Sequence, residues 1–299
     1  MWKKAKEQIC PKIEYRDTEH GRMITACQCT EGDVVLPDDI QGIPVTGIGE
    51  YAFARTRVTK IWLPARLSEI GRYAFYRCRD LRELTLTDSL LEIGGGALTG
   101  CRLSEVEIHF YEGKKSCLKS IVDEIRFALR ASLYYHHEDR EARVLFPEHY
   151  EEAVENTPAR LLVTHHHGAG GYYRQCFYNR ELDYKKYDEL FFRTVAEEEN
   201  RTAAELALNR LRYPYRLERP AQEVYESYLK RHMEDAAGLL IESEDTKGLA
   251  FLASQGFFTE ESLDRAVMMA AKQEKVGILS ILMDEKHRKY PKKRKTFEL

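Results

Sequence analysis

Residues 70–86, IGRYAFYRCRDLRELTL, decide the architecture of the first third of this 299-residue chain. Segments like their beginning recur at residues 48–53 (IGEYAF) and 93–98 (IGGGAL), at offsets of 22 and 23 residues. Apolar-x-apolar triplets at 61–63, 84–86 and 106–108 repeat at offsets of 23 and 22 residues. One period shared by unrelated features predicts a solenoid, in which each coil buries its apolar side against its neighbours.

The pattern within each coil predicts its local structure. The triplets have a period of two, so each is expected to be a short strand with two side chains directed into the stack. Glycines follow the repeated isoleucines at positions 49, 71 and 94, where we expect them to permit a tight bend. Residues 12–17 and 22–28 flank a turn and predict a β-hairpin that caps the solenoid, and residues 34–40 predict an incomplete first coil.

The pattern I-G-x-x-A-F-x-x-C-x-x-L-x-x-L-x-L, complete in residues 70–86, resembles the BspA-type leucine-rich repeat. Residues 35–53, VLPDDIQGIPVTGIGEYAF, are similar to the usual first repeat of that family. The sequence departs from the pattern at Thr56, which stands where Cys is expected, and at Leu98, which replaces Phe. The resemblance covers roughly residues 12–112 and implies a recognition scaffold of a kind often found on bacterial cell surfaces.

The remaining two thirds of the chain predict a mostly helical region, so the expected fold class is α+β. The expected domains are residues 1–115, the repeat domain with its hairpin cap, and residues 116–299, with helix pairs or a bundle toward 203–290. An apolar stripe from Leu118 to Leu129 has helical spacing and predicts a helix that covers the last coil. Residues 144–146 suggest a strand, 148–156 a helix and 168–171 a glycine-rich loop.

Helix signals are clearer after residue 183. Residues 202–205 read as a capping box, and apolar residues from Tyr225 to Leu240 follow one face of a long helix. Gly256 is expected to end a short helix and Thr259 to cap the next, with a last helix near residues 278–282. An offset of about 29 residues between two of these segments gives a weak resemblance to ankyrin-like helix pairs.

Composition excludes several classes of protein. No apolar run approaches the ~18 residues that span a bilayer. The 46 basic and 49 acidic residues give a net charge of -3, which disfavours nucleic acid as the partner. The first residues carry no apolar segment typical of a secretory signal, and the seven cysteines are dispersed and odd in number. We therefore expect reduced thiols and a cytoplasmic location.

No segment carries a recognisable catalytic signature, so we expect no enzyme and no cofactor. His165, His166 and His167 precede Gly-Ala-Gly-Gly and could bind a metal ion, which leaves a metal-dependent or other enzyme around these residues and 172–174 as the alternative. We favour a polar loop there, since consecutive histidines cannot all face one ion from a regular element. The basic run at 286–295 is interpreted as a solvated terminus, with phosphate binding as its alternative.

The strand surface offers the candidate binding site. If the triplets point inward, alternation exposes the residues between them. These are Lys60, Trp62, Glu83, Thr85, Glu105 and Glu107, followed by His109. An exposed Trp among charged residues is typical of an interface hot spot, although it could equally pack beneath a neighbouring loop or the helical region. The sequence thus favours a non-enzymatic protein–protein interaction scaffold that binds another protein or peptide.

Overall fold

The computed structural model describes residues 12–28, 31–156 and 161–291, in two compact units, Met1–Glu197 and Glu198–Leu299. Its strands are β1 (Ile13–Thr18), β2 (Gly21–Cys27), β3 (Glu31–Val35), β4 (Asp39–Ile40), β5 (Ile43–Ile48), β6 (Arg57–Trp62), β7 (Glu69–Ile70), β8 (Glu83–Thr87), β9 (Glu92–Ile93), β10 (Glu105–Phe110), β11 (Leu129–Tyr135), β12 (Arg140–Phe146), β13 (Tyr150–Asn156), β14 (Leu161–His167), β15 (Phe177–Tyr178) and β16 (Glu181–Leu182). Its helices are α1 (Leu118–Glu124), α2 (Gly170–Tyr173), α3 (Tyr184–Glu189), α4 (Phe191–Glu197), α5 (Asn200–Arg212), α6 (Arg219–Arg231), α7 (Met233–Glu242), α8 (Thr246–Ser254), α9 (Glu260–Lys272) and α10 (Val276–Lys289).

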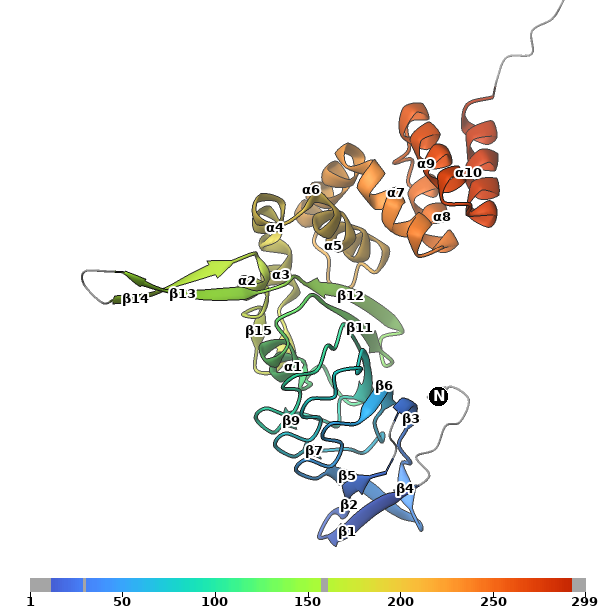
Figure 1. Ribbon diagram of the computed structural model, residues 1–299. Coiled ribbons are helices and arrows are strands. Elements are labelled where there is room, and N and C mark those ends of the chain that lie inside the picture. Colours follow the sequence, from blue (N-terminus) through green and yellow to red (C-terminus); the bar gives the residue numbers. More distant parts are fainter. Residues whose placement is uncertain (1–11, 29–30, 157–160, 292–299) are drawn as a thin grey trace, which may run out of the picture. The chain divides into compact units, whose positions relative to one another are not determined.

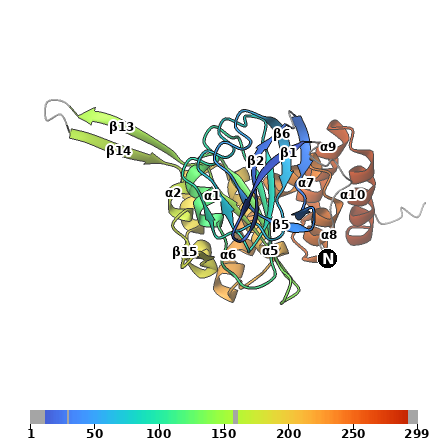
Figure 2. The same cartoon turned by 90° about the horizontal axis from the view of Figure 1, so that it is seen from below.

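Residues 22–135 form a β-solenoid of about five turns, which confirms the predicted solenoid and extends it beyond residue 112 (Figures 1 and 2). Its wide wall is a six-stranded sheet in the order β12-β11-β10-β8-β6-β3. Strands β3 to β11 of this wall pair in parallel, and β12 closes the edge antiparallel to β11. The second wall has the order β1-β2-β5-β7-β9, in which β1 and β2 form the predicted antiparallel hairpin.

The core lies between the two walls. Apolar side chains of successive coils stack in columns there, and Phe53 and Phe75 have ring centroids 5.2 Å apart. A column of small donors accompanies them: the Cys78 thiol donates to the carbonyl of Phe53 at 2.9 Å, and the Thr56 hydroxyl donates to that carbonyl at 2.8 Å. The two bonds differ, because Cys78 donates to a carbonyl of the preceding coil, as Cys101 does to Phe75, whereas Thr56 donates within its own coil.

The repeated glycines are needed for close stacking. An added Cβ would lie 2.6 Å from the amide nitrogen of Glu50 at Gly71, and 2.5 Å from that of Arg72 at Gly94. Neither glycine has a positive φ, so contact between coils, not a left-handed bend, excludes a side chain there. The left-handed non-glycine positions in the first two coils are instead Tyr51, Arg55, Tyr73 and Arg77, at a cost of about 1 kcal/mol each.

The predicted helix over Leu118–Leu129 is only half correct. Helix α1 ends at Glu124, and Leu129 begins strand β11, which adds another parallel strand to the wide wall. The apolar residues of β11 also alternate with a period of two, and pairing with β10 and β12 satisfies its backbone on both sides. The prediction failed because the helical stripe and the strand alternation share Leu129.

Helix α1 ends the stack of coils on the turn side. In the earlier coils, the amides of Phe53 and Phe75 donate to carbonyls of the following coil, both at 2.8 Å. The equivalent amide of Leu98 donates instead to the Glu124 carboxylate at 2.7 Å, and that of Gly96 donates to the same carboxylate at 2.8 Å. Glu124 thus replaces the backbone acceptors of the missing next coil, which confirms that this helix covers the last one.

Residues 134–197 correct two further predictions. The strand candidate at 144–146 lies in β12, but the helix expected at 148–156 is strand β13, paired antiparallel with β14. Its glutamates favour a helix locally, and the ladder with β14 overrides that preference. The glycine-rich loop is shorter than expected, because Gly170 already begins helix α2.

A buried arginine joins α1, α2 and Pro147, the residue that follows β12. Arg174 is 4% exposed, and burial lowers its pKa to about 10. Its guanidinium donates to five backbone carbonyls at 2.7–3.3 Å: those of Val122, Ile125, Phe127, Pro147 and Gly170. Because three of these belong to α1 and the segment that follows it, Arg174 satisfies carbonyls that the short helix leaves unpaired.

The second unit is helical, as predicted, with two differences. Helix α5 begins at Asn200 after Glu199, so Thr202 lies inside the helix and the predicted capping box there is wrong. The long helix predicted from Tyr225 to Leu240 is two helices, α6 and α7, which break at His232 with φ -115° and ψ 39°. Thr259 caps α9 as expected, and Gly256 has a positive φ after α8.

No helix in the described parts of the chain has the length and apolar character needed to cross a bilayer. The expected division into domains at residue 115 and the ankyrin-like resemblance stay predictions.

Candidate functional site

The outward side of the wide wall brings the predicted binding residues together. Strand register places them in two rows that run across the sheet. The first row is Asp33, Lys60, Glu83, Glu105 and Arg130, and the second is Val35, Trp62, Thr85, Glu107, Ser132 and Arg143. We call these two rows the strand face.

The first row is mostly acidic. Lys60 Nζ lies 2.5 Å from Glu83 Oε1, and this hydrogen bond raises the pKa of Lys60. Glu105 is exposed, and among the described residues it forms no ion pair. The row therefore presents an unneutralised carboxylate beside an ion pair.

The second row places an aromatic ring, that of Trp62, next to a short side chain, that of Thr85. Trp62 is half-buried, and its partners in register are Val35 and Thr85. Thr85 is only 8% exposed, so the prediction that its side chain is exposed is wrong. Thr85 is short and lies between Trp62 and Glu107 on the adjacent strands, and these longer side chains shield it from solvent. The Trp62 indole therefore lies beside a short, buried side chain on the neighbouring strand, Thr85.

A stack of rings lies at the end of the strand face, where β10 and β11 finish. The ring of His109 lies 4.9 Å from that of Tyr134 and 5.1 Å from that of His136, and Tyr111 lies 4.3 Å from His136. His109 Nε2 is 2.6 Å from Glu107 Oε1, and its Nδ1 is 2.9 Å from His136 Nε2. We call these four rings the imidazole–tyrosine stack.

Burial lowers the pKa of His136, and the neighbouring His109 lowers it further. A carboxylate organises the loop beneath: Asp88 Oδ2 accepts the backbone amides of Tyr111, Glu112 and Gly113 at 2.7–3.0 Å. The stack therefore rests on a loop held by a buried acceptor, and the lowered pKa of His136 favours the neutral form of that imidazole.

Sequence reasoning missed the β11 and β12 part of this surface and the stack. The signal was present, because Leu129, Ala131, Leu133 and Tyr135 alternate with polar residues in the same register as the earlier triplets. Reading that segment as a helix hid Arg130, whose exposed side chain extends the first row.

The histidines of the alternative hypothesis lie in a strand. Residues 165–167 belong to β14 and pair with β13, so the polar loop expected there is wrong. The side chains of His165 and His166 lie outside the described ones, and His167 is exposed. Within the described residues, no three His, Cys, Asp or Glu side chains form a group that could hold a metal ion. A metal site at these histidines stays a prediction.

The described cysteines only partly match the expected reduced thiols. Cys78, Cys101, Cys117 and Cys176 are free and buried. Burial raises the pKa of Cys117 and Cys176 to about 12, which keeps both protonated and weakly nucleophilic. Cys27 is disulfide-bonded, so the expectation of reduced thiols is wrong at that position. Disulfides persist in oxidising compartments, and the cytoplasmic location stays a prediction.

The beginning of the basic run lies at the end of α10. Lys286 pairs with Asp264, and Arg288 pairs with Glu285 at 2.5 Å. Lys289 also lies 3.9 Å from Glu285, so three of its cations have acidic partners, and residues 292–295 lie outside the described part of the chain.

Part of the solenoid matches a known repeat family. Residues 46–128 match the BspA type leucine rich repeat region, in six copies. A solved structure, the crystal structure of a T. pallidum leucine-rich repeat protein (TpLRR), is 21% identical over 32% of this chain and 68% of its own, with a TM-score of 0.20. A search of curated proteins found no match.

Proposed function

Starting from the BspA-type leucine-rich repeats of residues 46–128, we propose that this protein is a non-enzymatic scaffold that binds another protein through its strand face. The observation that carries the proposal is the register that aligns Trp62 and five polar residues on adjacent parallel strands. Parallel strands hold such side chains at fixed spacing, so a partner can bind without rearranging them.

The chemistry of the strand face favours a partner with a basic and an apolar side chain close together. Glu105 offers a carboxylate with no ion pair, and Glu107 lies next to it in the second row. Trp62 offers a rigid, half-buried ring beside buried Thr85. A Lys or Arg of the partner would contact the carboxylates while an apolar neighbour packs against the indole.

Removal of the ring should cost most of the affinity. Truncation of an aromatic hot spot typically costs about 2–4 kcal/mol, or roughly 30- to 900-fold in Kd. A charge reversal at Glu105 should weaken binding mainly through slower association, with a stronger effect at low salt.

Photocrosslinking in the native cell tests the proposal. A benzophenone amino acid is placed at Trp62 in one variant and at Tyr178 in the matched control, because Tyr178 is 82% exposed but lies in β15, away from the strand face. We expect a discrete protein adduct from position 62 that is absent from position 178. The identified partner is then titrated against Trp62→Ala and Tyr178→Ala. Equal adducts from both positions, or equal affinities of the two alanine variants, would refute the proposal.

A further inference from the structure

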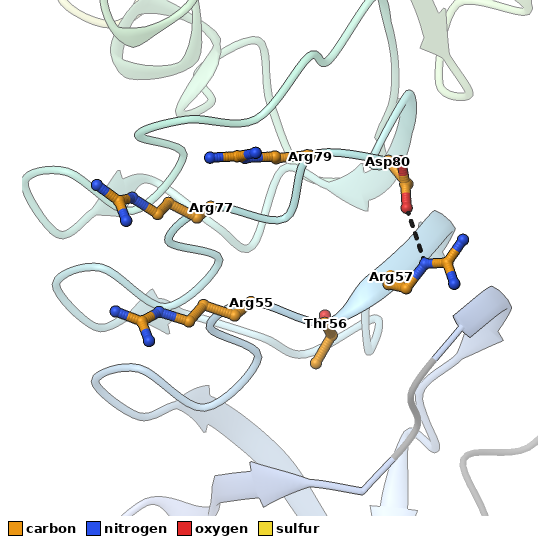
Figure 3. Close-up of a pocket in the computed structure, with 6 residues that line it drawn as sticks. All are labelled: Arg55, Thr56, Arg57, Arg77, Arg79 and Asp80. Carbon is orange, nitrogen blue, oxygen red and sulfur yellow. Dashed lines mark hydrogen bonds and ion pairs between the residues drawn. The ribbon is translucent and has the colours of Figure 1, made fainter.

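A pocket rich in arginine lies at the other end of strand β6, on the turns that connect the two walls of the solenoid. It has a volume of about 450 Å³ and spans two adjacent coils (Figure 3). Its lining residues are Arg55, Thr56, Arg57, Arg77, Arg79 and Asp80. We call it the arginine pocket.

The coil geometry stacks two of these arginines directly. Arg55 and Arg77 have φ values of 64° and 58°, and Gly100 occupies the same place in the third coil at 81°. The amide of Arg55 donates to Tyr76 O, and that of Arg77 donates to Thr99 O, both at 2.8 Å. Glycine is the residue that this left-handed position favours, so the first two coils carry a long cationic side chain where the backbone alone would prefer none.

Most of the positive charge in the pocket is not neutralised. Asp80 supplies the carboxylate of the pocket, and it pairs with Arg57: Arg57 Nε lies 3.4 Å from Asp80 Oδ2. Arg55, Arg77 and Arg79 are exposed and form no ion pair with any described residue. Figure 3 shows their three guanidinium groups directed to the same side, away from the Arg57–Asp80 pair. Four guanidiniums and one carboxylate leave the pocket strongly cationic in a chain whose net charge is -3.

We propose that the arginine pocket binds a phosphate monoester carried by a protein, such as a phosphorylated serine or threonine. Guanidinium groups match the oxygens of a phosphate with two parallel hydrogen bonds each, and a dianion relieves the repulsion between neighbouring cations. Tyr76, whose ring lies 5.1 Å from the Arg77 guanidinium carbon, offers a surface for residues next to the phosphate.

The extent of the charge favours one phosphate over a nucleic acid strand. The unpaired guanidiniums come from two coils, and strands of neighbouring coils lie about 4.8 Å apart. The Arg55–Arg77 column ends at Gly100, and on the opposite side Arg57 lies 3.9 Å from Glu31. A strand of nucleic acid would require a longer cationic track that neutralises several phosphates. This pocket is separate from the strand face and does not depend on the function proposed for it.

Titration of the full chain tests this assignment. The probe is an uncharged pentapeptide with a central phosphoserine, added at pH 7.5 and low salt, and the readout is the arginine side-chain Nε–H signals in a heteronuclear NMR spectrum. We expect saturable shifts of the Arg55, Arg77 and Arg79 signals that the unphosphorylated peptide does not cause. No shift, or equal shifts with both peptides, would overturn the proposal.

Variants separate the pocket from general attraction of anions. Arg77→Gly, which keeps the left-handed backbone, should weaken phosphopeptide binding about tenfold. Asp80→Asn removes the one carboxylate and should strengthen it about threefold. The control, Arg66→Gln, changes an exposed arginine outside the pocket and should leave affinity unchanged. Equal losses from the Arg77 and Arg66 changes would overturn the proposal.

Two competitors distinguish the source of the phosphate. Inorganic phosphate should bind more weakly than the phosphopeptide, and a ten-nucleotide single-stranded DNA should not displace the peptide at equal phosphate concentration. Tighter binding of inorganic phosphate would identify a free-anion site, and tighter binding of the oligonucleotide through the same arginines would identify a nucleic-acid site. Either result would overturn the assignment to a phosphorylated protein.

Discussion

Replacement of Glu124 should open the last coil of the solenoid while leaving the earlier coils closed. Its two carboxylate oxygens accept the amides of Gly96 and Leu98 at 2.8 and 2.7 Å, in place of a further coil. Glu124→Ala leaves both amides without this acceptor. Glu124→Gln keeps one oxygen and turns an amide N–H₂ group toward the other donor.

The size of the effect follows from these two bonds. A hydrogen bond to a charged group contributes about 1.5–3 kcal/mol, which gives roughly 3–6 kcal/mol for the pair. Glu124 is half-buried, so water replaces part of this, and we expect a loss of about 2–4 kcal/mol for Glu124→Ala. That corresponds to a roughly 30- to 900-fold larger equilibrium constant for opening of the last coil. Glu124→Gln should cost about half as much.

Hydrogen–deuterium exchange read by mass spectrometry measures this locally. Peptides covering residues 93–103 should lose protection in Glu124→Ala, while peptides covering residues 48–58 should keep it. The matched control is Asp123→Ala on the same helix, because Asp123 forms an exposed pair with Lys119 that contributes less than about 1 kcal/mol. Equal exchange in the two variants, or a loss of protection spread evenly over all coils, would refute the capping role of Glu124.

Three further predictions concern packing, a buried cation and pH. Gly94→Ala should destabilise the solenoid by more than about 3 kcal/mol in chemical denaturation, because its Cβ would lie 2.5 Å from backbone, whereas Gly95→Ala, with open space around it, should be neutral. Arg174→Met should cost about 3–5 kcal/mol in the same assay, since it leaves buried carbonyls without a donor; a loss below about 1 kcal/mol would contradict this role. His136 has a lowered pKa in the folded chain, so the unfolded chain binds its proton first and stability should fall as the pH drops below about 6.5; an NMR titration that places this pKa above 6.5 would exclude the effect.

Local patterns predicted those elements whose register repeats along the chain. The period of 22–23 residues predicted β6, β8 and β10 and the columns through Phe53 and Phe75, because each coil contacts only its neighbours. The same repeat predicts Trp62, Glu83 and Glu105 on adjacent strands, as the structure has them. Alternation within a strand decides the face of a side chain but not its exposure, so the burial of Thr85 was not foreseen.

The wrong secondary-structure predictions fall in segments that fit both a helical and a strand periodicity, or in segments whose structure depends on pairing with distant residues. Leu129 belongs to a helical stripe and to a strand alternation, and pairing with β10 decides for the strand. The helix expected at 148–156 is a strand because its backbone pairs with β14, which the local pattern of these residues does not include. Helix α6 ends at Arg231 although the apolar face continues past it.

By itself, the sequence determined that coils stack, how long each coil is and which side chains of each strand face outward, because these depend on neighbours one period away. Tertiary structure alone decided where the stack ends and what its edges carry. Glu124 caps the last coil, and Arg174 holds α1 to Pro147, the residue that follows β12. These depend on hydrogen bonds and charges between residues that no local period relates, and only the folded chain brings them within contact distance.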